Sequence, residues 1–270
     1  MESEHIITER HGRVGIIRFN RPEELNTLHP GMFREVCDQL ELWNVDGSVG
    51  AVVLTGGGRA FCAGGHFGAW KSQLDGGSAE TDARPPRRPT SSQEFWSRWA
   101  GLVRDSKPII VAINGPAIGA GTTLTLPADV RIAGEAARFS MRFARIGITP
   151  EFGSTFLLPR LVGLGHAMEL ALSGRIIDAH EACRIGLVNR VAPQALLMDV
   201  AVEVAAEIAF NPTEGLRAIK SMMWDQLEDP DLEEAQEKEW VALDAAMAKP
   251  AFREAVDAFL EKREPRFHPP

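Results

Sequence analysis

The chain has 270 residues, of which 44% are hydrophobic and 24% are charged, a composition typical of a globular protein with a sizeable core. Its 29 basic and 37 acidic residues give a formal net charge of −8, which excludes a general electrostatic attraction to nucleic acid or to an anionic membrane. The three cysteines have no CxxC spacing, so neither a disulfide framework nor a metal site is predicted.

The sequence contains no feature that directs it to a membrane or to secretion. No apolar run reaches the roughly 18 residues that a membrane-spanning helix needs. The first residues, MESEHIITERHG, are acidic and polar, whereas a signal or transit peptide is apolar or basic. We therefore expect a cytoplasmic protein.

The first half of the chain predicts an α/β arrangement. Short aliphatic runs typical of strands occur at 14–19, 50–56 and 107–113. Residues 72–92 are rich in Gly, Ser and Pro and almost free of large apolar side chains, so we expect a mobile loop there. Between the first two strands, apolar residues at helical spacing predict an amphipathic helix that packs on the sheet: Met32, Phe33, Val36, Leu40 and Trp43.

After about residue 192 the pattern becomes helical, with helices predicted at 195–210, 213–227, 231–248 and 251–263. Something must cover the apolar face of the last helix. The sequence leaves open whether that is the chain's own core or another subunit. This face is a complete stripe at helical spacing: Phe252, Ala255, Val256, Phe259 and Leu260.

Two glycine-rich segments, 55–70 and 114–126, each follow an apolar strand. Neither contains a phosphate-binding GxxxxGK[ST] or GxGxxG pattern, so ATP and NAD are not predicted ligands. Glycine allows a ligand to approach the main chain closely. A helix that begins near Ala120 or Gly121 would also direct free N–H groups at such a ligand. Two turns of this kind could hold an oxyanion between two amides, although each alone could be a simple tight turn.

Several segments in order and at matching spacing resemble the enoyl-CoA hydratase/isomerase family, the crotonase superfamily. They are Asn20-Arg21-Pro22 with Leu25-Asn26, AFCAGG at 60–65, NGPAIGAG at 114–121, Ala128-Asp129, LPRLVG at 158–163, the stretch 172–191 and AFLEKREPRF at 258–267. The resemblance implies an α/β fold, a crotonase-like spiral of ββα units, with a C-terminal helical trimerisation region. It also implies a division into an acyl-CoA-binding core, 1–192, and an oligomerisation region, 193–270, in a homotrimer or hexamer.

The resemblance further implies an acyl-CoA thioester as substrate, with coenzyme A as part of that substrate and no separate cofactor. The main-chain N–H groups of Gly65 and Ala120 then bind the thioester oxygen, where each such donor contributes on the order of 3 kcal/mol to the transition state. His66 stands where the family commonly has Asp or Asn, and it either contacts substrate or is structural. The other residues expected along the substrate are Leu25, Ala63, Phe67, Gly68, Trp70, Thr123, Phe143, Phe259 and Lys262.

The type of reaction depends on the carboxylates. By resemblance to the family, Thr123 and Phe143 stand at the two positions where its hydratases carry Glu. Neither side chain can act as a general base. Glu151, in a PExxS segment, is similar to the base of the Δ3,Δ2-enoyl-CoA isomerase branch. The same residues also fit an ordinary helix start, with Thr149 as N-cap, Pro150 next and Glu151 in the first turn.

Three functions are therefore consistent with the sequence. The first is an isomerase that uses Glu151 to move a proton from C2 to C4 of an enoyl-CoA. The second is a hydratase or other lyase that uses His66 or Glu151 to handle water. The third is a trimer that binds acyl-CoA without catalysis.

Overall fold

The computed structural model describes residues 5–75, 96, 98–228 and 231–268. In these residues the strands form a six-stranded sheet, ordered β1-β2-β3-β4-β6-β9, and a three-stranded sheet, ordered β5-β7-β8. Only β1 runs antiparallel to its neighbour in the larger sheet. The strands are β1 (Ile6–His11), β2 (Val14–Phe19), β3 (Ala51–Gly56), β4 (Ile109–Ile113), β5 (Pro116–Ile118), β6 (Val130–Gly134), β7 (Arg138–Ser140), β8 (Ile177–Asp178) and β9 (Arg190–Ala192).

The helix predicted between the first two strands and the four predicted after residue 192 are present as α1, α8, α9, α10 and α11, with the C-terminal ends shifted by no more than a few residues. The expected loop at 72–92 is wrong at its start, because residues 72–74 belong to α2, and 76–92 lie outside the described residues. The helices are η1 (Pro22–Glu24), α1 (Pro30–Val45), α2 (Phe67–Leu74), α4 (Trp99–Asp105), α5 (Ala120–Thr123), η2 (Arg142–Ile146), α6 (Ser154–Ser173), α7 (Ala179–Arg184), η3 (Gln194–Leu196), α8 (Leu197–Phe210), α9 (Thr213–Glu228), α10 (Leu232–Met247) and α11 (Pro250–Glu261).

The inner strands β2, β3 and β4 of the larger sheet are buried on both faces, whereas the edge strand β1 is exposed beyond Ile6. Side chains alternate along each strand, so that Ile16 and Val53 pack with α8, whereas Ile17 and Val52 pack with α1 and the smaller sheet. This two-sided burial explains why the strands are continuous aliphatic runs instead of alternating apolar and polar residues.

Beyond β4 the chain passes repeatedly between the two sheets. β4 and β6 lie in the larger sheet, and β5 and β7, which follow them directly, lie in the smaller one. The first pair is followed by α5, and the second by η2 and α6. The prediction of an α/β spiral of ββα units followed by C-terminal helices is thus confirmed.

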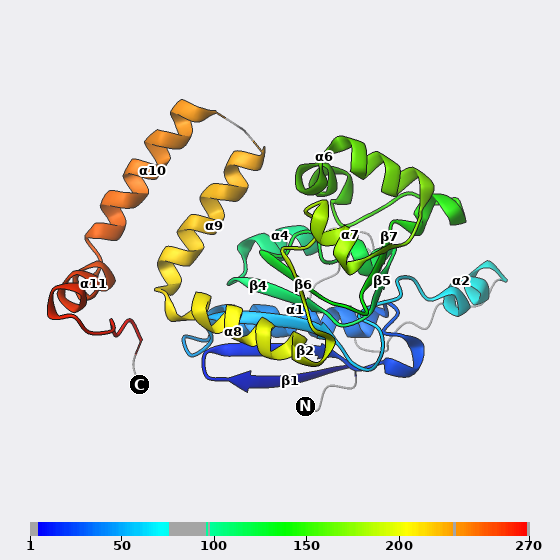
Figure 1. The fold of residues 1–270 in the computed structure, drawn as a ribbon, viewed down its shortest axis with the longest axis horizontal. Coiled ribbons are helices and arrows are strands. Elements are labelled where there is room, and N and C mark those ends of the chain that lie inside the picture. The colour runs from blue at the N-terminus through cyan, green and yellow to red at the C-terminus, as the bar shows by residue number, and fades with distance from the viewer. Residues whose placement is uncertain (1–4, 76–95, 97, 229–230, 269–270) are drawn as a thin grey trace.

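The C-terminal helices α9, α10 and α11 extend away from the α/β body (Figure 1). Lys220 joins α9 to the α/β body, because its Nζ donates a hydrogen bond to Asp129 Oδ2 at 2.7 Å. The division at 192/193 stays a prediction, and α8, the first helix beyond it, packs on the larger sheet. None of the helices described is long and apolar enough to span a membrane.

Candidate active site

The two glycine-rich segments lie side by side. The Cys62 N–H donates to the Pro116 carbonyl at 3.1 Å, and the Ile118 N–H donates to the Cys62 carbonyl at 3.0 Å. A Cβ on Gly64 would lie only 2.5 Å from the Ile118 oxygen and 3.5 Å from the Ala120 nitrogen. The absence of side chains at these turns therefore permits a main-chain approach that other residues would block.

Gly65 and Ala120 are the residues at which this approach exposes amides. Ala120 is the first residue of α5, after Gly119 with φ +56°, so its N–H has no acceptor within the helix. Neither the Ala120 N–H nor the Gly65 N–H donates a hydrogen bond to any residue that the structure describes. Both amides are thus available to a ligand, and their convergence on one oxygen stays a prediction.

Asn26 holds the first turn in place. Its side chain is fully buried, and its Nδ2 donates to the carbonyls of Gly57 (2.9 Å) and Ala60 (2.8 Å). Its Oδ1 accepts from the Arg21 N–H at 3.0 Å. The preceding Leu25 adds a main-chain bond, because its carbonyl accepts from the Ala63 N–H at 3.0 Å. The sequence analysis did not predict this role for Asn26. The signal that could have indicated it is a polar residue at the end of the NRPEELN segment.

Aromatic side chains lie beside the turns that carry the two amides. The Trp70 indole of α2 rests on Gly65, where an added Cβ would lie 2.3 Å from the ring. The buried Phe143 ring lies 3.8 Å from where a Cβ on Gly119 would be. Phe67 is exposed on α2. These positions agree with an apolar path beside Gly65, and contact with substrate stays a prediction.

Glu151 lies beside the second glycine-rich segment. Its Oε1 accepts a hydrogen bond from Thr123 Oγ1 at 2.8 Å, and its charge acts on the buried Cys62 thiol. Burial raises the pKa of the Glu151 carboxyl above its ordinary value, and the hydrogen bond from Thr123 partly opposes this rise. A half-buried carboxyl with a raised pKa is suited to accept and return a proton.

The helix-start explanation of Glu151 is wrong. The helix α6 begins at Ser154 with Gly153 as its N-cap, and Glu151 precedes it in a non-helical segment. The next residue, Phe152, has a φ of +58° and is buried against Phe33, with the ring centroids 5.7 Å apart. Burial of this ring holds the main chain in a conformation that bulky residues rarely adopt. No local pattern signals this conformation.

The two positions compared with hydratase glutamates are both enclosed. Thr123 has no exposed surface, and Phe143 is 5% exposed. A threonine hydroxyl and a phenyl ring cannot together activate a water molecule by removing its proton. Of the three side chains Thr123, Phe143 and Glu151, only Glu151 can act as a base.

His66 is directed toward a carboxylate. Its Nε2 lies 3.0 Å from Glu24 Oε2, and both side chains are about two-fifths exposed. Arg21 also donates to Glu24 at 2.7 Å, and this hydrogen bond lowers the pKa of the Glu24 carboxyl. The ring also lies 2.9 Å from where a Cβ on Gly68 would be. This pairing agrees with a structural role for His66, without testing a contact with substrate.

Phe259 and Lys262 are not brought to this region within one chain. The helix α11 that carries Phe259, and that Lys262 follows, lies at the opposite end of the molecule from α2 and β5 (Figure 1). The Phe259 side chain is 80% exposed. A role for either residue at the thioester therefore requires a second copy of the chain.

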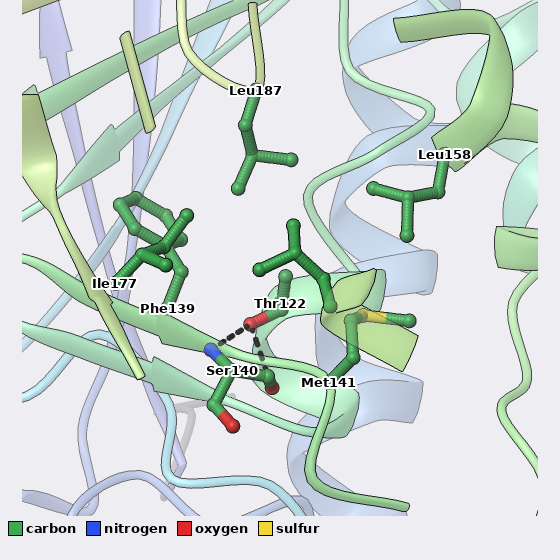
Figure 2. Close-up of a pocket in the computed structure, with 8 residues that line it drawn as sticks. Thr122, Phe139, Ser140, Met141, Leu158, Ile177 and Leu187 are labelled. Carbon is green, nitrogen blue, oxygen red and sulfur yellow. Dashed lines mark hydrogen bonds between the residues drawn. The ribbon is translucent and has the colours of Figure 1, made fainter. Parts of the chain in front are cut away.

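The inner side of α5 is fixed to the smaller sheet. Thr122 Oγ1 donates to the Ala117 carbonyl at 2.5 Å and accepts from the Ser140 N–H at 3.3 Å. Figure 2 shows Thr122 and Ser140 among apolar side chains that include Leu158 and Leu187. The gap between these described residues has no room for a water molecule. No ligand can therefore reach α5 through this gap.

The described residues contain no group of three or more His, Cys, Asp or Glu side chains that could hold a metal ion. An open depression of about 260 Å³ does lie at η1, lined by Glu23 and Glu24 and also by Arg21 and His5.

Comparison with known proteins identifies the family of the chain. A family model described as enoyl-CoA hydratase/isomerase matches residues 9–270. The 1,2-epoxyphenylacetyl-CoA isomerase of Escherichia coli is 34% identical over 98% of both chains. A probable enoyl-CoA hydratase of Rhodobacter capsulatus is 36% identical over 94% of both. The crystal structure of an enoyl-CoA hydratase from Bacillus anthracis superposes with a TM-score of 0.87, at 32% identity, over 98% of this chain and 99% of that one.

Proposed function

The chain belongs to the enoyl-CoA hydratase/isomerase family and is an acyl-CoA-processing enzyme with the crotonase fold, and from this premise we propose that it moves the double bond of a 3-enoyl-CoA to position 2. Glu151 is the proposed base. The observation that carries the proposal is the hydrogen bond between Thr123 and Glu151 beside the two glycine-rich turns. Glu151 is thus the single carboxylate at this place, because positions 123 and 143 carry Thr and Phe.

The chemistry of this reaction needs one base and one oxyanion site. Glu151 takes a proton from C2, and the C–H electron pair forms a C1–C2 double bond as the thioester carbonyl becomes an enolate oxygen. The N–H groups of Gly65 and Ala120 stabilise this oxygen. The protonated Glu151 then delivers the proton to C4, where the C3–C4 double-bond electrons bind it. The C1–C2 double-bond electrons become the C2–C3 double bond, and the enolate oxygen returns to a carbonyl.

The scheme needs no redox group, because one proton leaves and returns and the oxidation level of the substrate as a whole does not change. We propose that coenzyme A enters only as part of the substrate. The residues proposed along the thioester and acyl path are Leu25, Ala63, His66, Phe67, Gly68, Trp70, Thr123 and Phe143.

The second candidate is hydration of a 2-enoyl-CoA. The names of the Rhodobacter capsulatus relative and of the Bacillus anthracis structure favour it. In this chain it would require Glu151 or His66 to activate water without the pair of carboxylates described above. We therefore rank it behind isomerisation.

Two assays on the purified protein separate these candidates. Conversion of a 3-enoyl-CoA to its 2-enoyl isomer is followed by the rise of the conjugated-enoyl absorbance, and hydration of crotonyl-CoA by its loss. We expect isomerisation to be the faster reaction. Glu151→Gln should lower it by roughly 10²- to 10⁴-fold, the usual contribution of a general base.

Each alternative result contradicts a different part of the proposal. Faster hydration of crotonyl-CoA would reject the isomerase function, and undiminished isomerisation by Glu151→Gln would reject Glu151 as its base. Binding of acyl-CoA by calorimetry without turnover on a panel of thioesters would support the non-catalytic trimer. Glu151→Gln is a suitable variant because the Gln oxygen can still accept the hydrogen bond from Thr123.

We also propose that α9, α10 and α11 join copies of the chain into a homotrimer or hexamer, with Phe259 and Lys262 near the substrate of a neighbouring copy. Support comes from large apolar side chains that these helices expose: Ile219, Met223, Trp240, Val241, Leu243, Met247, Phe252, Val256, Phe259 and Leu260. Light scattering should give three or six times the chain mass of 29.5 kDa. A monomer would contradict the assembly.

A further inference from the structure

We propose that Thr123 is a positioning residue that holds Oε1 of Glu151 against the turn carrying Ala120 and leaves Oε2 free to exchange the proton. The catalytic part of this inference rests on the proposed function. The positional part concerns the Glu151 carboxylate alone and is testable without turnover.

The geometry around the Thr123 hydroxyl supports a single main acceptor. Its Oγ1 lies 2.8 Å from Glu151 Oε1 and 3.3 Å from the Ala120 carbonyl oxygen. The hydroxyl has one proton to donate, and a bond to an ionised acceptor is the stronger of the two. The branched side chain has restricted χ1 freedom, and burial further limits it. The hydroxyl is therefore held facing Glu151.

Glu151 depends on this contact because its own segment lies outside any helix. In the described part of the chain, the Thr123 hydroxyl is the only hydrogen-bond donor to the Glu151 carboxylate. Loss of the hydroxyl would leave both carboxylate oxygens free to rotate. The proton-accepting oxygen would then lose its fixed position relative to substrate.

The contact also joins the base to the proposed oxyanion donor. Thr123 belongs to α5, which begins at Ala120, and its N–H donates to the Gly119 carbonyl at 3.1 Å. Base and amide are thus separated by one short helical turn and one hydrogen bond. Productive geometry within about 1 Å matters for rate, so this link fixes the distance between the base and the oxyanion donor.

The hydroxyl has a second effect on Glu151, because it stabilises the ionised carboxylate against burial. Burial raises the pKa of Glu151, and the hydrogen bond from Thr123 lowers it. The titratable group that faces Glu151 across the turn is Cys62, whose thiol pKa burial raises to about 12. Cys62 therefore stays neutral over the pH range in which Glu151 titrates. Removal of the Thr123 hydroxyl should raise the Glu151 pKa further.

The test compares Thr123→Val, which removes the hydroxyl at similar volume, with Thr123→Ser, which keeps it. Thr125→Val is a matched control, because Thr125 is also buried but donates to the Thr122 carbonyl, not to Glu151. The first readout is the Glu151 pKa from the carboxyl signal of ¹³C-glutamate-labelled protein, with Glu151→Gln to assign the signal. The second is the pH profile of kcat on a 3-enoyl-CoA.

We expect Thr123→Val to raise the Glu151 pKa, to move the acidic limb of the profile to higher pH and to lower kcat about 10-fold or more with little change in KM. Thr123→Ser should restore most of each property, and Thr125→Val should leave the pKa unchanged. If Thr123→Val does not fold, the pair Thr123→Ala and Thr123→Ser makes the same comparison.

The two readouts separate the failure of this inference from that of the proposed function. An unchanged Glu151 pKa in the variants that lack the hydroxyl would overturn the positioning role. A raised pKa with no isomerisation by the unmodified protein would support the positioning of Glu151 and reject the isomerase function. A fall in kcat without any change in pKa or pH profile would indicate a merely structural effect and would also overturn the inference.

Discussion

Gly121 of α5 lies directly against the main chain of Cys62, so that a Cβ on Gly121 would fall 1.9 Å from the Cys62 carbonyl oxygen. The same carbonyl accepts the Ile118 N–H. The start of α5 and the first glycine-rich turn can therefore approach only because position 121 has no side chain.

Gly121→Ala should force these two segments apart. We expect it to lower turnover at least 10-fold, because Ala120 moves relative to Gly65, and to destabilise the fold by about 1–3 kcal/mol, the usual effect of overpacking. Gly101→Ala is the control, since a Cβ there would meet nothing within 4 Å. Chemical denaturation and steady-state kinetics check both variants. Equal activity of the two would contradict the close approach.

The raised pKa of Glu151 predicts the pH dependence of activity. The ionised carboxylate is the proposed base, so kcat/KM should fall as pH decreases through the Glu151 pKa in the free enzyme. Burial places this pKa above the ordinary value of a glutamate, near 4.3. A profile of kcat/KM from pH 4 to 9 measures the pH at which activity falls on the acidic side. An acidic limb at or below the ordinary glutamate pKa would be inconsistent with Glu151 as a buried base.

The raised pKa of Glu151 also predicts that the folded protein becomes more stable when the Glu151 charge is removed. Because burial raises the folded-state pKa above the unfolded one, the stabilising contribution of Glu151 is present at low pH and is lost as pH rises through the folded-state pKa. Glu151→Gln should therefore melt at a higher temperature than the unmodified protein near neutral pH. The difference should shrink as pH falls, and thermal melts across pH measure it. A variant less stable at neutral pH would disprove the prediction.

Asn26 should be essential to the first turn. Asn26→Ala removes a donor to the Gly57 and Ala60 carbonyls and the side-chain acceptor of the Arg21 N–H. The Ala60 carbonyl then keeps only the longer bond from Asn114 Nδ2 at 3.4 Å among the described residues. A buried polar group that loses its partner costs about 1–3 kcal/mol. We therefore expect the free energy of unfolding to fall by about 3 kcal/mol and turnover to decrease. Urea unfolding at neutral pH provides the measurement. A change below about 0.5 kcal/mol, typical of an exposed site, would show that this network contributes little.

Lys220 should anchor α9 more strongly than a surface lysine does. It is 8% exposed and pairs with Asp129 Oδ2 at 2.7 Å. Lys220→Met should destabilise the fold by about 2 kcal/mol, because the Asp129 side chain then keeps, among the described residues, only the hydrogen bond from the Ile109 N–H. Lys71→Met, which removes an exposed pair with Asp75, should change stability by less than about 0.5 kcal/mol. Similar effects of the two substitutions would contradict the anchoring role.

The elements of the fold were accessible from sequence because they depend on local periodicity. The predicted strand at 14–19 is β2 without any shift of its ends, and the stripe of Met32, Phe33, Val36, Leu40 and Trp43 forms the buried face of α1. Side chains at such spacing share one face regardless of their partners. The spiral and the family followed from the order of the motifs and not from periodicity, because sequence periodicity shows no repeat.

The segment before α6 shows where local reasoning fails. Thr149 and Pro150 have the chemistry of a helix start, yet the helix begins at Ser154. Burial of Phe152 against the Phe33 ring outweighs capping preferences that are worth only about 1 kcal/mol. This partner comes from a distant part of the chain, so no pattern within the segment reveals it.

The sequence alone determined the positions of β2, β3, β4, α1 and the C-terminal helices, the family, and Gly65, Ala120 and Glu151 as candidates, because short-range patterns and motif order carry that information. Only the tertiary structure decided that Thr123 donates to Glu151, that Asn26 holds the first turn, and that α11 lies far from this region within one chain. These relationships depend on how the two sheets bring distant segments together, and contacts between such segments leave no periodic trace in the chain.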